Sequence, residues 1–246
     1  MKVTLLSYTQ DAVDLLIFSK KTRLNMTPEG FDKIKHMTID SKQDELEYIF
    51  GTIGSSWEFV DYVFLITGVT RAFTHQLVRH RVGVSFAQQA QRVINMSDFE
   101  YISTGGCQDN PVYDDTMVEI ADAYGVLIDE GVHPQDARGL LPTNIKTNIL
   151  MKCNLRTLSG LLNIRLCVKA QGEFQNVARE MRKIVLEIHP WAEPVLQVHC
   201  VQFGSCTFPN YQECPVKQHG YAKHEDAEAI KKIWENQRSE AQTKGK

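Results

Sequence analysis

The amino-acid sequence predicts an α+β fold, in which a mixed or antiparallel sheet packs with long helices. Two observations lead to this class. Short stretches rich in β-branched and aromatic residues, typical of strands, occur in both halves of the chain. Between them lie longer stretches whose apolar residues recur at helical spacing. The 246 residues can bury a sizeable core and contain no repeat or low-complexity linker, so we expect a single domain over 1–246, frayed from about 237.

In the first half of the chain, strand and helix signals alternate. We expect strands over residues 2–8 and 58–69 and helices over 12–20 and 44–51. Gly68 is expected to break the second strand. Thr70 can then cap a helix that runs to about His80, because its hydroxyl can accept a hydrogen bond from a first-turn amide. Residues 84–93 show no helical pattern and are expected to be extended.

The second half is predicted to be mainly helical. Its patterns indicate helices over 116–129, 154–167, 171–189 and 227–234, and a strand over 143–153. Asn154 is a good N-cap for the second of these helices. The pair His189-Pro190 ends the third, because the residue before a proline disfavours the helical conformation. Pro134 is expected to open a short helical turn that ends near Gly139.

The charge balance restricts the classes of partner. The net charge is −3 and the pI is about 6.2. Such a chain has no global basic field for nonspecific nucleic-acid binding, so an anionic ligand must be held by a local cluster of arginines. No stretch approaches the roughly 18 apolar residues of a membrane span, and the N-terminus turns polar too soon for a signal peptide. We therefore expect a cytoplasmic protein with neither membrane nor nucleic-acid partners.

The six cysteines contain no CxxC pair, so reduced thiols are the simpler expectation. The densest group of sulfur and imidazole side chains could be drawn as a metal site. It consists of His199, Cys200, Cys206, Cys214 and His219. Its spacings match no standard zinc pattern, so we expect ordinary buried thiols and no metal.

The most unusual local sequence is Arg79-His80-Arg81. Basic residues at the end of a helix can simply complement its macrodipole. The following segment, however, continues to supply amide side chains and ends in another arginine. These side chains are Gln88, Gln89, Gln91 and Arg92. Amides and guanidinium groups in one short extended stretch suit a ligand with phosphate oxygens and a hydrogen-bonding base.

A second basic group contains Arg156 and Arg165, with Arg138 upstream. At about 100° per residue, the nine positions between Arg156 and Arg165 place them about 180° apart on one helix. They cannot both face one pocket within a single subunit. This arrangement fits either a solvated helix or a site assembled between subunits.

These motifs together resemble the flavin-dependent thymidylate synthase family. Arg79-His80-Arg81 and the run to Arg92 are similar to its RHR signature. A second signature region is matched by Asn154-Leu155-Arg156, Asn163-Ile164-Arg165 and Ala170-Gln171-Gly172-Glu173. Arg138-Gly139-Leu140-Leu141-Pro142 lies at the family's spacing upstream, and Gly54-Ser55-Ser56-Trp57-Glu58 resembles its flavin-proximal loop. The resemblance spans about residues 50–190, and several motifs in order are more specific than one triplet.

The resemblance implies roles for individual residues. The flavin FAD would be contacted by Ser55, Arg79, His80, Arg81, Gln88, Asn154, Leu155, Arg156 and the position of Gly160. The nucleotide dUMP would be bound by Gln76, Arg79, Gln88, Gln89, Ala90, Gln91, Arg92 and Arg138. Arg165 would lie at the uracil as the catalytic residue, where a permanent cation stabilises charge that develops on the ring.

The resemblance also implies a reaction and an assembly. The family transfers a methylene group from methylenetetrahydrofolate to dUMP, which yields dTMP. Hydride from FAD completes the methyl group, and NADPH restores the flavin. The family forms homotetramers whose sites are shared between subunits, which agrees with the opposed Arg156 and Arg165.

The sequence departs from the family pattern at five positions. Ala90 stands in place of a serine, Gly160 of an asparagine, Lys169 of a histidine, Gln88 of a common glutamate and Ile53 of another histidine. Ala90 and Gly160 motivate an alternative, a catalytically silent homologue that binds flavin or nucleotide. A nucleic-acid-binding module is a third interpretation, disfavoured by the acidic balance and the lack of interleaved aromatic and basic residues.

Overall fold

A computed structural model describes residues 1–21, 26–208, 210 and 214. The helix expected over 227–234, His219 and the tail from 237 lie outside these residues. Two compact units share the chain. Unit 1 comprises Met1–Thr4, Phe64–Arg81 and Ser85–Met151, and unit 2 comprises Leu5–Val63, Val82–Val84 and the described residues from Lys152 onward.

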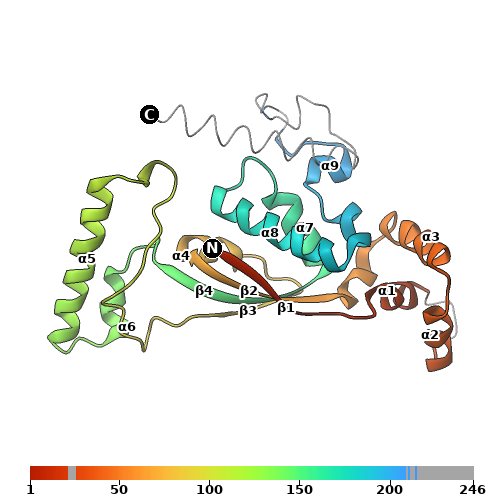
Figure 1. Cartoon of the computed structure of the whole chain (residues 1–246), viewed down its shortest axis with the longest axis horizontal. Coiled ribbons are helices and arrows are strands. Elements are labelled where there is room, and N and C mark those ends of the chain that lie inside the picture. The colour runs from red at the N-terminus through yellow and green to blue at the C-terminus, as the bar shows by residue number, and fades with distance from the viewer. Residues whose placement is uncertain (22–25, 209, 211–213, 215–246) are drawn as a thin grey trace. The chain divides into compact units, whose positions relative to one another are not determined.

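The fold is α+β, as predicted, with one four-stranded sheet. Its strands are β1 (Lys2–Tyr8), β2 (Asp61–Thr70), β3 (Val84–Gln88) and β4 (Lys146–Asn154), in the order β1-β2-β4-β3 (Figure 1). Lys2 hydrogen-bonds with Thr67, and Thr9 with Asp61, so β1 and β2 are antiparallel. The prediction that Gly68 breaks the second strand is wrong. Gly68 takes a positive φ of 64° inside β2, and its amide donates to Asn148 Oδ1 at 3.0 Å, which keeps the strand paired.

Unit 1 carries the helices α4 (Arg71–Leu77), α5 (Pro111–Asp129) and α6 (Pro134–Ala137), and the 3-10 helices η2 (Gly105–Cys107) and η3 (Arg138–Leu140). Thr70 caps α4 as predicted, since its hydroxyl accepts from the Phe73 amide at 3.0 Å. The helix ends at Leu77, short of the expected His80. α5 begins before the expected residue 116, because Asn110 caps it and Pro111 occupies its first position.

Unit 2 carries α1 (Ala12–Lys20), α2 (Pro28–Lys35), α3 (Ile39–Phe50), α7 (Leu155–Arg165), α8 (Gly172–Ile188) and α9 (His199–Phe203), with η1 (Gly54–Phe59) and η4 (Pro190–Val195). α1 matches its expected range, and α8 ends before His189-Pro190 as predicted. α2 was not predicted, although Thr27 caps it and Pro28 opens it. α3 starts before residue 44 because Thr38 caps it.

The core of unit 2 includes the seam between α7 and α8, which lie side by side (Figure 1). Leu158 and Leu162 of α7 and Phe174, Val177 and Met181 of α8 are fully buried. Burial of each such side chain contributes roughly 1.5–3 kcal/mol, so this seam fixes where α7 stands. Within the described residues, no helix has the length and apolar character needed to cross a membrane.

Candidate active site

The segment after α4 presents the first predicted cluster in unit 1. The Arg79 amide donates to the Gln76 carbonyl at 3.4 Å, and the His80 amide to Leu77 at 3.1 Å, so a turn continues past the end of the helix. Arg79 and Arg81 are exposed, while Gln76 and His80 are half-buried. Two guanidinium groups therefore face solvent from a short, ordered turn.

The run of amide side chains over residues 88–92 begins at the end of β3, where the chain is still paired with β4. Gln88 donates to Thr74 Oγ1 at 2.9 Å, which fixes its side chain against α4. The Gln89 amide donates to the Asn148 carbonyl at 3.0 Å. Gln91 is buried, and its Nε2 atom makes no hydrogen bond within the part of the chain that the structure describes. Ala90 and Arg92 are exposed on either side of it.

Arg138 has an arginine neighbour that sequence reasoning missed. Arg71, the first residue of α4, is half-buried, and its Nη1 atom is enclosed without a hydrogen-bond partner among the described residues. Burial lowers the pKa of Arg71, and the positive charge of Arg138 lowers it further. Two like charges lie close together, and one has an orphaned donor, which is the electrostatic pattern of an anion site. The sequence signal was a cation in the first turn of a helix, where acidic residues are usual.

In unit 2, Val82 and Gly83, which directly follow Arg81, are hydrogen-bonded to the start of α7. The Asn154 amide donates to the Gly83 carbonyl at 3.2 Å, and Thr157 Oγ1 donates to the Val82 carbonyl at 2.7 Å. Gly83 has a φ of 65°, and a Cβ there would lie 2.4 Å from Thr157 Oγ1. Only glycine fits this close approach. Asn154 also caps α7 as predicted, with Oδ1 accepting from the Thr157 amide at 2.9 Å.

The other residues predicted to contact flavin in unit 2 differ in exposure. Ser55 is exposed in η1, and Arg156 is exposed and pairs with Glu58 of η1 at 2.6 Å. Leu155 is fully buried, so only its backbone could reach a ligand. Gly160 is exposed on α7, and a Cβ there would meet nothing within 4 Å.

Arg165 is the last residue of α7, and it contacts a different neighbour from Arg156. Its guanidinium carbon lies 4.3 Å from the centre of the Phe174 ring on α8. The ring is fully buried, so it offers a rigid face on which the planar cation stacks. Arg156 and Arg165 therefore contact different elements, η1 and α8, which is consistent with their predicted placement on different faces of α7.

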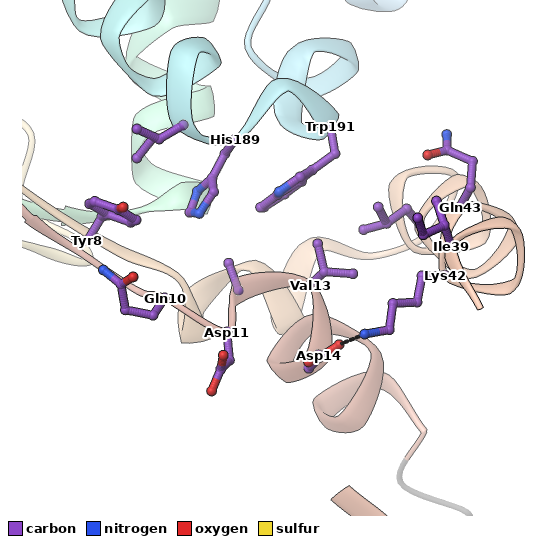
Figure 2. Close-up of a pocket in the computed structure, with 13 residues that line it drawn as sticks. Tyr8, Gln10, Asp11, Val13, Asp14, Ile39, Lys42, Gln43, His189 and Trp191 are labelled. Atoms are coloured by element: carbon purple, nitrogen blue, oxygen red, sulfur yellow. Dashed lines mark ion pairs between the residues drawn. The ribbon is translucent and has the colours of Figure 1, made fainter. Parts of the chain in front are cut away.

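A hollow in unit 2 is separate from all these residues. A cavity of about 520 Å³ lies among the start of α1, the start of α3 and the end of α8. Figure 2 shows His189 and Trp191 opposite Asp11 and Asp14, with Lys42 paired to Asp14 at 2.6 Å. His189 is buried, and its pKa falls to about 4 because burial disfavours the imidazolium. Burial also raises the pKa of Tyr62, whose hydroxyl shares a hydrogen bond with His189 Nδ1 at 3.0 Å.

Comparison with known proteins places the chain in a family. A family model described as thymidylate synthase complementing protein matches residues 4–191. The flavin-dependent thymidylate synthase of Pyrococcus furiosus is 33% identical over 223 residues, which cover 84% of this chain and 89% of that protein. The chain belongs to the flavin-dependent thymidylate synthase family. A second family member, from Geobacter sulfurreducens, is 32% identical over 198 residues, with 77% and 84% of the two chains covered.

A solved structure supports the same fold. The flavin-dependent thymidylate synthase of Helicobacter pylori, complexed with FAD and dUMP, superimposes with a TM-score of 0.61 at 21% identity. The match covers 78% of this chain and 97% of that one. The family match over residues 4–191 contains every predicted site residue, whereas Cys200, Cys206 and Cys214 lie beyond it.

Proposed function

We propose that this flavin-dependent thymidylate synthase methylates dUMP to dTMP, with methylenetetrahydrofolate as the carbon donor. FAD, when bound, would supply the hydride that completes the methyl group, and NADPH would restore it. The solved relative from Helicobacter pylori holds FAD and dUMP, which supports both ligands for this chain.

The observation that carries the proposal is the Arg71–Arg138 pair. Like charges repel, and a buried donor without a partner costs roughly 1–3 kcal/mol. A doubly charged phosphate group relieves both penalties, because its oxygens accept from each guanidinium and neutralise the charge. A family that binds a nucleotide monophosphate needs such a site. We assign the dUMP phosphate to Arg138, as the resemblance implies, and add Arg71.

The base and sugar of dUMP require neutral hydrogen-bonding groups. Gln91 offers a buried Nε2 donor that needs an acceptor, and a uracil carbonyl or a sugar oxygen would supply one. Gln88 is already oriented by its bond to Thr74. Together with Gln76, Gln89 and Arg92, these side chains form the proposed remainder of the nucleotide site, with Ala90 contributing only its backbone.

The described residues fit an anionic flavin nucleotide. Exposed Arg79 and Arg81 supply charge for its phosphates. The Gly83 backbone is bonded to the cap of α7, which fixes the conformation of the chain just after Arg81. His80, Gln88, Ser55 and the Asn154-Leu155-Arg156 turn complete the proposed contacts. Gly160 leaves open space where the family has an asparagine.

Arg165 is the proposed catalytic residue. Contact with the Phe174 ring orients the guanidinium of Arg165. Such a cation can bind the uracil edge and stabilise negative charge that develops on the ring during transfer of the one-carbon unit. An ammonium group would lack both the planar fork and the stacking.

Self-association is proposed from α5 as well as from the family resemblance. Met117 and Tyr124 of α5 are buried, while Val112, Val118 and Val126 are exposed by 75%, 57% and 55%. At about 100° per residue, the three valines occupy an arc opposite the buried pair. A second apolar face on one helix is best covered by another copy. We propose a homotetramer whose sites are shared between subunits.

The experiment is a titration of the purified chain with FAD and then dUMP, followed by visible absorbance. We expect the flavin spectrum to shift with dUMP but not with deoxyuridine, which lacks the phosphate. Addition of methylenetetrahydrofolate and NADPH should then yield dTMP. Binding of both ligands without dTMP would support the silent homologue instead, and no flavin binding would refute both.

A further inference from the structure

The end of η4 is hydrogen-bonded to both α7 and α8. Three successive backbone carbonyls there each accept a side-chain donor: Val195 from Ser159 at 2.6 Å, Leu196 from Arg182 at 2.6 Å and Gln197 from Asn163 at 2.7 Å. Carbonyls at the end of a helix lack partners within it, so side chains commonly satisfy them. Ser159 and Asn163 are four positions apart and therefore share one face of α7. That face is thus held against the end of η4.

The acceptors of the Asn163 side chain are themselves held in place. Gln197 is buried, and its Nε2 atom donates to Glu193 Oε1 at 2.7 Å. The same carboxylate pairs with Arg182 at 3.1 Å, and both of these side chains are mostly buried. The second acceptor is Gln202 Oε1 of α9, at 2.6 Å. Since an amide nitrogen carries two hydrogens, these two bonds use both donors of Asn163.

Asn163 lies in the last turn of α7, two residues before Arg165. Two residues correspond to about 200°, so the two side chains leave the helix on nearly opposite sides. Asn163 bonds to the segment around α9, whereas the Arg165 guanidinium lies 4.3 Å from the Phe174 ring of α8. The last turn of a helix frays most readily because its carbonyls lack partners within the helix. Its rotation therefore depends on side-chain contacts such as those of Asn163.

We propose that Asn163 is a positioning residue for Arg165. Its two hydrogen bonds hold the last turn of α7 in the rotation that places the Arg165 guanidinium on the Phe174 ring, where it can bind the uracil of dUMP. This inference rests on the proposed role of Arg165 in dTMP formation, and it gives a task to the remaining polar residue of the Asn163-Ile164-Arg165 motif. Asn163 acts through Arg165 and does not touch the substrate. A catalytic group displaced by about 1 Å can lose about 100-fold in rate, so a small rotation of this turn is enough to matter.

The kinetic test compares two variants of the same face of α7. Asn163→Leu has a similar volume and removes both donors, whereas the control Ser159→Ala removes the bond to Val195, six residues before Arg165. Both should lower stability in urea. Only Asn163→Leu should lower kcat for dTMP formation, by roughly 10-fold to 100-fold. In an Arg165→Ala background, Asn163→Leu should cause hardly any further loss, because its effect passes through the missing guanidinium.

A spectroscopic test reads the position of Arg165 without any need for activity. In nuclear magnetic resonance spectra of arginine-labelled chain, the guanidinium signals of Arg165 are those that Arg165→Ala lacks. The Phe174 ring current should shift them upfield in the wild type, because the guanidinium lies over the ring. Asn163→Leu should lose this shift and Ser159→Ala should keep it. Gln202→Ala, which removes one acceptor of Asn163, should reduce the shift in part, and it serves as the test variant if Asn163→Leu does not fold.

The outcomes separate this inference from the proposed function. Wild-type signals of Arg165 in Asn163→Leu, or in Gln202→Ala where Asn163→Leu does not fold, would overturn the inference. So would equal losses of dTMP formation in Asn163→Leu and Ser159→Ala, or a loss from Asn163→Leu that is as large without Arg165 as with it. A wild-type chain that forms no dTMP would refute the proposed function, and the Arg165 signals would still decide whether Asn163 positions that side chain.

Discussion

Replacement of Arg71 should weaken nucleotide binding and stabilise the protein without ligand. Arg71→Met removes one charge-assisted hydrogen bond to phosphate, worth roughly 1.5–3 kcal/mol, so the Kd for dUMP should rise about 10-fold to 150-fold. It also removes an enclosed Nη1 donor without a partner and the repulsion from Arg138. The free energy of unfolding without ligand should therefore rise by about 1 kcal/mol. This value is at the low end of the usual cost of a buried, unpaired donor, because the Arg71 side chain is only half-buried.

Two assays separate these effects. Calorimetric titration gives the Kd for dUMP and for deoxyuridine, and urea unfolding without ligand gives the stability. Lys146→Met is the matched control, because it removes a cation of unit 1 that pairs with Glu100 at 3.0 Å on the surface. We expect this control to change stability by less than about 0.5 kcal/mol and dUMP binding hardly at all. An Arg71→Met protein that binds dUMP as tightly as the wild type would refute the phosphate assignment. Destabilisation of that variant without ligand would refute the reasoning about the unpaired guanidinium.

Four further changes test other residues. Arg165→Ala should lower dUMP affinity and dTMP turnover, with a loss of roughly 1.5–3 kcal/mol in stabilisation of the bound states and an intact fold by circular dichroism. Arg165→Lys should restore activity only in part, and wild-type kinetics in Arg165→Ala would exclude the catalytic role. Ala90→Ser should tighten dUMP binding by at most about tenfold, since one neutral hydrogen bond contributes roughly 0.5–1.5 kcal/mol, and turnover only in the serine form would show that the hydroxyl is essential. Gly160→Asn should tighten FAD binding in a fluorescence titration, because a Cβ at this position meets no neighbour. Gly160→Ala should add only helix stability, and equal FAD affinities of the two variants would oppose a flavin contact at this position. The pKa of His189, about 4, is below its unfolded value of about 6.5, so the free energy of unfolding should fall by about 1–3 kcal/mol as the pH drops from 6.5 to 4. His189→Asn, which keeps a hydrogen-bonding side chain beside Tyr62, should flatten that part of the pH profile measured by urea unfolding.

Local signals in the sequence predicted most of the elements. Thr70 and Asn154 were recognised as N-caps from side-chain chemistry alone, and both make the expected bonds. Apolar periodicity predicted α8 within one residue at each end. α2 was missed because its apolar residues are few, although the Thr27-Pro28 start was a readable signal.

Features that depend on distant contacts could not be predicted from local patterns. Gly68 remains in β2 because Asn148 of β4 bonds its amide, a partner 80 positions away. The enclosure of the Arg71 Nη1 donor and the proximity of Arg138 are revealed only by the fold. The segment around α9 packs on α7 because Asn163 bonds to Gln197 and Gln202, partners 34 and 39 positions away. The sequence pattern supplied the residue types of the site, and tertiary contacts determined which side chains are fixed, buried or unpaired.

The most direct test of the proposed function is dTMP formation by the chain with alanine at position 90. Purified protein is mixed with FAD, dUMP, methylenetetrahydrofolate and NADPH, and dTMP is measured by liquid chromatography, with each component omitted in turn. We predict dTMP that depends on all four components and falls sharply in Arg165→Ala. Flavin and dUMP binding without any dTMP would contradict the enzymatic proposal for this member of the family.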